Sequence, residues 1–257
     1  MAVPALTVIT PVYNNNEYIS LCIENVLAQQ CPHVEHLIID GGSADGTVET
    51  IRKAAARYPH VRWVSEPDKG QSDAMNKGIG LAQSRVIGFL NADDYYEPGT
   101  LNRVCTIFSA LPNNSFAVGN CRIWQSETTF DLNTPSDLRF VSLAKKKSVH
   151  PYNPAAYFYH KTLHDEVGMY DLEDHYSMDL DFILRVVRRA HCYYFDEVWG
   201  NMRLRPGSKT FEDNRHGQAM KRMKETMKRN WDKAPIWLKW RYNLLPYFHK
   251  FSENIFK

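Results

Sequence analysis

The chain has 257 residues, of which 44% are hydrophobic and 23% are charged, and its 31 Lys and Arg nearly balance its 29 Asp and Glu. This is the composition of a globular protein, and it excludes a disordered, collagen-like or low-complexity chain. The apolar runs are far shorter than the roughly 18 residues that span a membrane. A signal peptide begins with a basic segment before its apolar run, and this chain has no basic residue there. The five cysteines are scattered and lack the CxxC spacing of a zinc site. We therefore expect a cytoplasmic protein.

The first part of the chain has the pattern of a parallel α/β sheet. Four short β-branched runs, at residues 6–9, 36–39, 61–64 and 86–90, begin about 25 to 30 residues apart, which is typical of βα units. Between the runs, apolar residues recur every three or four positions, as in residues 19–27, and predict helices with one buried face. The sequence thus predicts an open, mostly parallel α/β sheet with right-handed crossovers.

The second half is less regular. Residues 116–124 predict a strand at a sheet edge, residues 179–189 predict a helix, and residues 201–210, rich in Pro, Gly and Ser, predict a mobile loop. From residue 214 onward the chain carries 11 Lys and Arg against 3 Asp and Glu, together with a band of Trp, Tyr and Phe. We expect one domain over residues 1–213 and a basic, aromatic, helical extension over residues 214–257.

Acidic residues follow three of the four expected strands. The strands end in TPVYN, DGGSADGT, SEPDKG and NADD, and ligands of open α/β sheets bind at the carboxyl ends of the strands. Asp40, Asp68, Asp93 and Asp94 would thus converge on one rim, where their charge needs a compensating cation or hydrogen-bond donors. An oxygen-only cluster suits Mg²⁺ or Mn²⁺ bound together with phosphate. Each acid alone also fits a turn, and Asp45 is expected to cap a helix, but the coincidence at three strand ends favours a metal site.

Four motifs occur in a definite order and spacing: VITPVYN, IIDGGSADGT, SEPDKGQSDAMNKGI and FLNADD. In this arrangement they resemble glycosyltransferase family 2, whose enzymes have the GT-A nucleotide-sugar fold. The resemblance is strong over residues 5–100. The segment GMYDLEDHYSMDLDFILRV, which begins at Gly168, is more weakly similar to the acceptor side of those enzymes. The resemblance implies a nucleotide-sugar-binding half over residues 1–110 and an acceptor-binding half over residues 111–213, in an enzyme of the bacterial surface-polysaccharide type.

The resemblance also implies roles for residues at the strand ends. Pro11 and Tyr13 would line the nucleobase pocket, Asp40 would accept a hydrogen bond from the base, typically from N3 of uracil, and Asp68 would lie beside the nucleoside. UDP is preferred to GDP or dTDP on this ground alone.

The resemblance places a metal site at the end of the fourth strand. Asn91, Asp93 and Asp94 stand at the family's DxD position, where a carboxylate binds the Mn²⁺ or Mg²⁺ that bridges the diphosphate. Asp93 is expected at both the nucleotide and the metal. Because Asn91 replaces the Asp of many relatives, both Asp93 and Asp94 stay open as the direct ligand.

Asp179 stands in the place of the family's ED motif, with Met178 replacing the Glu, and would be the catalytic base. Helix geometry gives an independent reason to prefer it to Asp181. Asp179 precedes Ile183 by four residues and lies near the apolar face, whereas Asp181 precedes Arg185 by four and can form a surface ion pair. The alternative for Asp179 is a helix N-cap.

Basic residues of the second half offer further contacts. Arg203, Arg205 and Lys209 could close over the diphosphate, with a solvated basic loop as the alternative. His150 aligns with a position that is often His in similar enzymes and is expected to face the acceptor, the alternative being a structural histidine.

The extension over residues 214–257 has a net charge of +8 from its 11 basic and 3 acidic residues. One interpretation is an amphipathic segment on the anionic inner face of the cell membrane, which suits a lipid-linked acceptor. The other is helices that pack their aromatic residues on the domain or on a second copy in a homo-oligomer. The isoelectric point of 8.2 is weak evidence for nucleic-acid binding, and we expect no such partner.

Together these residues predict transfer of a sugar with inversion, from a nucleotide-diphosphate donor of the UDP-hexose or UDP-N-acetylhexosamine type to a glycan or lipid-linked acceptor. Two alternatives stay open. A sugar nucleotidyltransferase usually begins with a Gly-rich, basic loop after the first strand, which TPVYNNNEY lacks. A non-catalytic nucleotide- or glycan-binding module would not need the metal acids or Asp179.

Overall fold

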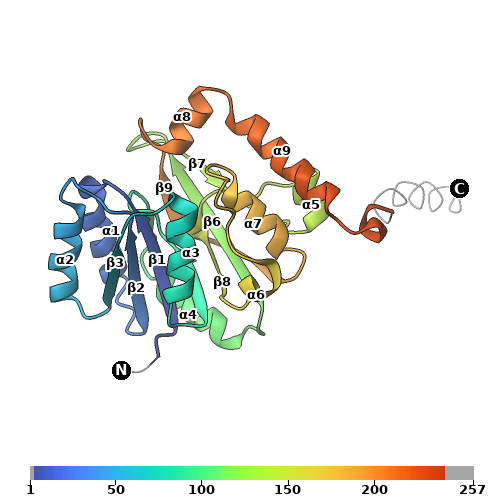
Figure 1. Ribbon diagram of the computed structural model, residues 1–257. Helices are drawn as coiled ribbons and strands as arrows, with labels where there is room; N and C mark the ends of the chain where they lie inside the picture. Colours follow the sequence, from blue (N-terminus) through green and yellow to red (C-terminus); the bar gives the residue numbers. More distant parts are fainter. Residues whose placement is uncertain (1–2, 241–257) are drawn as a thin grey trace, which may run out of the picture.

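The structure is a computed structural model that describes residues 3–240 (Figure 1). Its strands are β1 (Leu6–Val12), β2 (Val34–Asp40), β3 (Val61–Ser65), β4 (Val86–Phe89), β5 (Tyr95–Tyr96), β6 (Ser115–Trp124), β7 (Phe130–Asn133), β8 (Tyr157–His160) and β9 (His191–Arg203). Its helices are α1 (Asn16–Ala28), α2 (Thr47–Arg57), α3 (Gln71–Leu81), α4 (Thr100–Ala110), α5 (Phe140–Ala144), α6 (Leu163–Val167), α7 (Met178–Val186), α8 (Lys209–Arg215) and α9 (Ala219–Asp232), with a 3-10 turn η1 (Pro154–Ala156). The α/β class predicted from the sequence is confirmed.

One sheet runs through the described part of the chain in the order β3-β2-β1-β4-β8-β6-β9-β5, and β7 pairs with β6. The strands β3, β2, β1 and β4 are parallel, as the spacing of the βα units predicts. Beyond β4 the sheet is mixed, because β8 is antiparallel to both β4 and β6 while β9 runs parallel to β6. The prediction that residues 116–124 form an edge strand is wrong, because β6 lies between β8 and β9. Its first seven residues are buried, so local alternation could not reveal its place.

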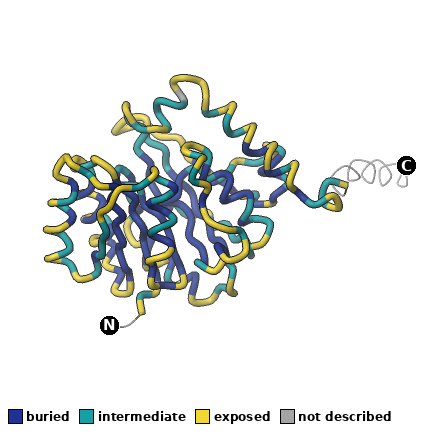
Figure 2. The backbone as a smooth tube through the Cα atoms, in the orientation of Figure 1, coloured by how far each residue is buried: buried dark blue, intermediate teal, exposed yellow. Residues whose placement is uncertain are grey.

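Helices cover both faces of the sheet, as Figure 1 shows. Alternate residues of β1 face opposite layers: Ile9 packs with α3 and α7, whereas Leu6 and Val8 pack with α1 and α4. The buried strands therefore form the middle layer, and the exposed residues lie on the outer helices and loops (Figure 2). Burial on both faces explains why the strands read as continuous apolar runs in the sequence.

The antiparallel joint between β4 and β8 depends on a glycine. Gly88 of β4 lies opposite Phe158 of β8, and a Cβ on Gly88 would come within 2.4 Å of the Phe158 ring. The large ring can therefore lie across β4 only because this position has no side chain. This joint connects the parallel half of the sheet to the mixed half.

The C-terminal part of the described chain packs onto the domain. β9 extends to Arg203 and α8 begins at Lys209, so the predicted loop over residues 201–210 is shorter than expected. Met227 of α9 and the following Ala234 belong to the same buried cluster as α7 and α5. The boundary expected at residue 213 thus does not separate two packing units, and residues 241–257 of the expected extension lie outside the described residues. Among residues 3–240, no helix is both long and apolar enough to cross a bilayer.

Candidate active site

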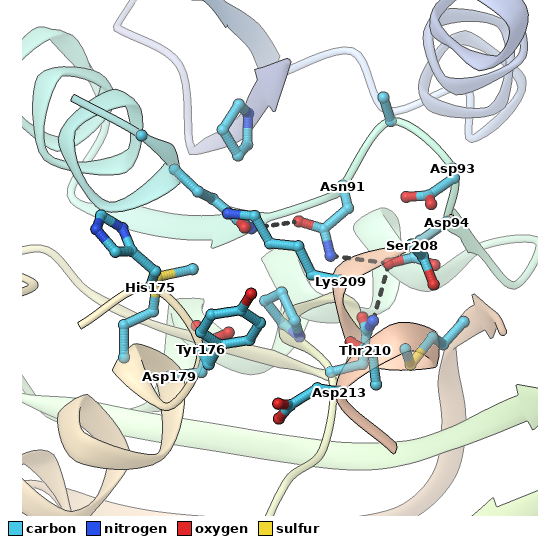
Figure 3. A pocket seen from close by; sticks show the side chains of 18 of the residues that line it. Asn91, Asp93, Asp94, His175, Tyr176, Asp179, Ser208, Lys209, Thr210 and Asp213 are labelled. Carbon is cyan, nitrogen blue, oxygen red and sulfur yellow. Dashed lines mark hydrogen bonds between the residues drawn. The ribbon is translucent and has the colours of Figure 1, made fainter. Parts of the chain in front are cut away.

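A cavity of about 1040 Å³ opens at the carboxyl ends of the parallel strands. Residues from both halves of the domain and from the segment after β9 line it, and Figure 3 shows side chains on several of its sides. Its lining includes most of the residues predicted from the sequence: Pro11, Tyr13, Asp68, Asp93, Asp94, His150, Asp179, Arg203, Arg205 and Lys209. The structure therefore brings together strand ends and a helix that lie far apart in the sequence.

Asp94 is almost completely buried in the loop after β4. Its Oδ2 accepts hydrogen bonds from Nδ2 of Asn91 at 2.9 Å and from Nδ2 of Asn153 at 2.8 Å, and its Oδ1 accepts the backbone N–H of Arg203 at 3.2 Å. Burial, and then the neighbouring charge of Asp93, raise the pKa of Asp94 to about 7. Such a carboxylate is held firmly in place, and a nearby cation would favour its charged form.

Asp93 reaches further into the cavity, with 18% of its side chain exposed. Nε of Arg205 donates to its Oδ2 at 3.0 Å, and Nη1 of Arg203 donates to its backbone carbonyl at 2.8 Å. The planes of these arginines also lie over rings, Arg203 over Tyr95 and Arg205 over Tyr18. Two of the three basic residues predicted to close over the diphosphate, Arg203 and Arg205, therefore already hold the loop that carries Asp93.

The residues present fit a divalent cation bound jointly with phosphate. Asp93 and Asp94 offer oxygen atoms only, and their adjacent charges are the reason that the pKa of Asp94 is raised beyond the effect of burial. No group of three or more His, Cys, Asp or Glu residues in the described part of the chain could hold a metal by itself. This suits Mg²⁺ or Mn²⁺, which commonly binds through one or two carboxylates and completes its shell with phosphate and water.

On the other side of the strand ends, the cavity has features that suit a nucleoside. Pro11 is buried at the end of β1, and Tyr13 stands at the rim with 64% of its surface exposed. Asp68 accepts the N–H of Gly70 at 2.8 Å through Oδ1. Its Oδ2 lies so close to Gly41 that a Cβ there would approach within 2.6 Å. The backbone of Gly41 and the carboxylate of Asp68 thus form one continuous wall.

Asp40 does not line this cavity, although the resemblance implies a contact with the base. The residue is fully buried. Its Oδ2 accepts the N–H groups of Gly42 and Ser43, each at 3.0 Å, and the hydroxyl of Ser65 at 2.7 Å, while its Oδ1 accepts the hydroxyl of Ser43. Asp40 thus holds the turn that carries the two glycines. Its Oδ1 accepts only one hydrogen bond from the described residues and can accept another, so the expected contact with a base stays a prediction.

Asp179 lies in the first turn of α7 and faces the cavity from the side opposite the β4 loop (Figure 3). The hydroxyl of Tyr157 donates a hydrogen bond of 3.1 Å to its Oδ1. Burial is the main cause that raises the pKa of Asp179 to about 6; Asp174 raises it further and the Tyr157 hydrogen bond lowers it. Ser177, not Asp179, occupies the N-cap position of the helix.

Asp181 is not on the surface, and the expectation of a surface ion pair is wrong in this respect. The i to i+4 pair with Arg185 forms, at 2.9 Å from Nε to Oδ2. However, Asp181 is buried beneath α9, where Arg229 and Asn230 also donate to it. The helix repeat predicts the contact of Asp181 with Arg185, whereas its contacts with α9 depend on the tertiary packing of two helices that are distant in the sequence.

His150 and Lys209 are the remaining predicted cavity residues. Burial, and to a lesser degree Lys146, lower the pKa of His150 to about 4, so it is neutral at pH 7. Burial lowers the pKa of Lys209, and the charge of Asp68 opposes this effect. Figure 3 shows Lys209 extending across the cavity from the start of α8.

The cavity also contains side chains that the sequence did not single out: Gln71, Asn153, His175, Tyr176 and Asp213. Asn153 donates to Asp94, and Nε2 of Gln71 donates to Oδ1 of Asn91 at 3.2 Å. Asn153 follows the predicted His150 by three residues, which is the one local signal that could have drawn attention to it. Gln71 lies within the motif SEPDKGQSDAMNKGI, and His175 and Tyr176 lie within the segment that begins at Gly168, so these motifs were the signal that could have found them.

The family model described as "Glycosyl transferase family 2" matches residues 7–167 of this chain. The chain belongs to glycosyltransferase family 2. Among the alternatives left open by the sequence, this match favours the glycosyltransferase.

Two relatives show the extent of the similarity. The chain is 30% identical over 187 residues to the PGL/p-HBAD biosynthesis glycosyltransferase of Mycobacterium bovis. This alignment covers 72% of this chain and 70% of the relative. It is 36% identical over 96 residues to the chondroitin synthase of Escherichia coli, covering 37% of this chain and 14% of that protein. The match to chondroitin synthase is therefore confined to one part of a much longer protein.

Two solved structures share the fold of this glycosyltransferase. Residues 1–349 of Staphylococcus aureus TarS, in complex with UDP-GlcNAc, align with a TM-score of 0.66 and 16% identity, over 79% of this chain and 60% of that one. The mannosyltransferase PcManGT of Pyrobaculum calidifontis, in complex with GDP-Man and Mn²⁺, aligns with a TM-score of 0.62 and 19% identity, over 85% of this chain and 62% of that one. At these identities the alignments establish a common fold.

Proposed function

We propose that this glycosyltransferase moves a sugar, with inversion, from a UDP-linked donor to a glycan or lipid-linked acceptor in surface-polysaccharide biosynthesis. The observation that carries the proposal is that Asp179, a half-buried carboxylate, faces the same cavity as Asp93 and Asp94 but comes from a different element. A base and a diphosphate site on different sides of one cavity are what an in-line displacement needs.

The proposed step is a direct displacement at the anomeric carbon. The acceptor hydroxyl oxygen forms the new bond to this carbon, its proton passes to the carboxylate of Asp179, and the bond from carbon to the diphosphate oxygen breaks. The nucleoside diphosphate then leaves with the electron pair. A divalent cation held through Asp93 would supply Lewis-acid stabilisation of that leaving group. Arg203, Arg205 and Lys209 line the same cavity and would add positive charge.

Among the two acids of the β4 loop, Asp93 is the better direct ligand. Asp94 is buried and already accepts three hydrogen bonds, whereas Asp93 is more exposed and has one charged side-chain partner. We assign Asp94 to positioning the loop. The proposed ion is Mn²⁺ or Mg²⁺. The structure of the P. calidifontis fold relative is a complex with Mn²⁺.

The nucleotide preference is proposed on the family resemblance and on the UDP-GlcNAc complex of the TarS fold relative. Tyr13 would stack on the base at the rim, Pro11 would lie below it, and Asp68 would lie beside the nucleoside. Asp40 would act through the turn that it holds.

Thermal stability in the presence of nucleotides tests this proposal directly. UDP, GDP and dTDP are each added with and without Mn²⁺, and the expected result is a Mn²⁺-dependent stabilisation by UDP, about 2.7 kcal/mol at 100 times the dissociation constant. An Asp179→Asn variant should keep this stabilisation and lose sugar transfer. Stabilisation by GDP alone would contradict the UDP assignment, and an active Asp179→Asn enzyme would remove Asp179 as the base.

The described part of the C-terminal segment supports a place on an anionic membrane surface as a further element of this proposal. Trp231 is half-buried and stacks on Phe140, as the packing interpretation expects. By contrast Ile236, Trp237 and Trp240 are 70%, 61% and 65% exposed. Exposed Lys221, Lys224 and Lys228 line α9. Exposed aromatic and basic residues together are typical of interfacial segments.

Flotation with liposomes tests the membrane element. The full chain should float with vesicles that contain anionic lipid and should not float with neutral vesicles. A Trp237→Ala, Trp240→Ala double variant should float less, while a Leu132→Ala variant, which removes an exposed apolar side chain of β7, should behave like the wild type. Equal flotation of the wild type and the double variant would contradict this proposal.

A further inference from the structure

The catalytic helix α7 is held from outside by α9, which lies next to it in Figure 1. The centre of the contact is Asp181, whose side chain is only 13% exposed. Its Oδ1 accepts hydrogen bonds from Nη2 of Arg229 at 3.0 Å and from Nδ2 of Asn230 at 2.8 Å, both from α9. Its Oδ2 accepts from Nε of Arg185 on α7 itself at 2.9 Å.

The same guanidinium reaches a second carboxylate. Nη2 of Arg229 also lies 3.3 Å from Oδ2 of Asp174, in the turn that leads into α7. Oδ1 of Asp174 accepts the backbone N–H groups of Tyr176 at 3.1 Å and Ser177 at 2.7 Å. Asp174 therefore shapes the turn at the start of the helix, and Arg229 connects this turn to the first full turn of α7.

Asp179 lies between these two anchored acids in the sequence, and among the described residues it forms no hydrogen bond or ion pair with Arg229 itself. We propose that Arg229 is a positioning residue of this glycosyltransferase: by bridging Asp174 and Asp181, it sets where Asp179 stands in the cavity. This inference rests on the proposed role of Asp179 as the base. It makes the C-terminal helix part of the acceptor side of the active site.

Burial of its two carboxylates distinguishes this bridge from an ordinary surface ion pair, although the side chain of Arg229 is 41% exposed. The side chains of Asp174 and Asp181 are only 14% and 13% exposed, so solvent screens their charges less than at a surface. Asn230, which shares Asp181 with Arg229, is buried as well. A planar guanidinium can serve two carboxylates at once, which the point charge of a lysine does poorly. Because a base must stand within hydrogen-bond reach of the hydroxyl it deprotonates, a small shift of α7 would lower the rate of transfer.

The test compares Arg229→Met with Lys53→Met. Each variant loses one positive charge from a helix, but Lys53 lies on α2, its side chain is 73% exposed, and its ion pair is with Glu49 of the same helix. We expect Arg229→Met to lower kcat at least tenfold while the dissociation constant of UDP, measured by thermal stability with Mn²⁺, stays within twofold of the wild type. Lys53→Met should leave both quantities unchanged.

An Asp174→Asn variant tests the bridge without disturbing α9. The amide oxygen of Asn can still accept the two N–H groups of the turn, so the variant should fold even where Arg229→Met does not, and its kcat should fall several-fold. The double variant should be no slower than the slower single variant, because both changes break one bridge.

A soluble Arg229→Met enzyme with wild-type kcat would overturn the inference, as would independent, multiplying effects of the two substitutions. Failure of the proposed function looks different, since it would appear as an active Asp179→Asn enzyme or as the absence of any nucleotide stabilisation in the wild type.

Discussion

The hydroxyl of Tyr157 on β8 donates a hydrogen bond of 3.1 Å to Oδ1 of Asp179 on α7. Tyr157 is completely buried, in the same core cluster as the apolar side chains of α7. The bond favours the ionised carboxylate, whereas burial favours the protonated one. Their balance sets the pH range in which Asp179 can accept a proton.

The transfer rate should depend on pH through Asp179. Its pKa is raised to about 6, mainly by burial, and a base acts only when ionised. We therefore expect kcat to rise with pH up to about 6 and to level off above about 7. Initial rates at saturating donor and acceptor between pH 5 and 8 check this. A rate that is flat down to pH 5 would contradict an ionising base of this pKa.

Tyr157→Phe should move the acidic limb of that profile to higher pH. Loss of a donor to the carboxylate raises the pKa of Asp179 further, by about one unit if the bond contributes about 1.5 kcal/mol. The rate at pH 6 should fall several-fold, and the rate at pH 8 should change little. Tyr159→Phe is the matched control, because its hydroxyl bonds to Nε2 of His164 and not to Asp179. An unmoved limb in Tyr157→Phe would show that the bond does not tune the base.

Asp93→Asn should remove the metal dependence of nucleotide binding. Asp93 is the more exposed acid of the β4 loop and the proposed metal ligand. The extra stabilisation by UDP that requires Mn²⁺ should therefore be lost, together with at least 100-fold in the rate of transfer. Thermal shifts with and without Mn²⁺ measure the first effect. Asp131→Asn, at an exposed position of β7, should keep the full response, and a Mn²⁺-dependent shift retained by Asp93→Asn would point to Asp94 instead.

Gly41→Ala should weaken nucleotide binding without unfolding the protein. The new Cβ would lie 2.6 Å from Oδ2 of Asp68, so the carboxylate must move out of its place in the cavity wall. We expect UDP to bind about tenfold more weakly, which corresponds to about 1.4 kcal/mol. Titration of UDP followed by calorimetry checks this. Gly80→Ala, where an added Cβ meets no atom within 4 Å, should bind UDP like the wild type.

Acid should destabilise the fold through His36. This histidine is completely buried, Thr10 Oγ1 lies 2.9 Å from its Nε2, and burial, with a smaller contribution from His60, lowers its pKa to about 3. Below pH 6.5 His36 is therefore protonated in the unfolded chain but stays neutral in the folded protein. The free energy of unfolding falls as the pH decreases towards 3. The loss from this residue should reach about 2 kcal/mol at pH 5.

Urea unfolding at pH 7.5 and pH 5 measures this loss. His36→Gln lowers the absolute stability but should remove this part of the pH dependence, whereas His191→Asn, at an exposed position, should leave it intact. The same pH dependence in His36→Gln and the wild type would contradict the assignment.

The first half of the fold and the location of the site could be predicted from local patterns. Buried parallel strands require short apolar runs, and an amphipathic helix requires apolar residues three and four positions apart, as on α1, where Ile19, Cys22, Ile23 and Val26 are buried. The topology of parallel strands then places their carboxyl ends at one edge, which predicts that Asp40, Asp68, Asp93 and Asp94 meet there; the last three line the cavity, and Asp40 does not. The helix repeat and the family resemblance favour Asp179 over Asp181 as the base.

Other features depended on contacts between distant segments. Asp40, Asp93 and Asp94 all follow strands, yet only the tertiary structure shows that Asp40 is enclosed by Ser43 and Ser65 while Asp93 stays open to the cavity. In the same way, Arg229 and Asp181 lie 48 residues apart, and no local pattern connects them. The sequence by itself determined the strands and helices of the parallel half of the sheet and which acids lie at strand ends, because these depend on neighbours along the chain. Only the tertiary structure decided which of those acids face the cavity, because burial depends on what packs against them.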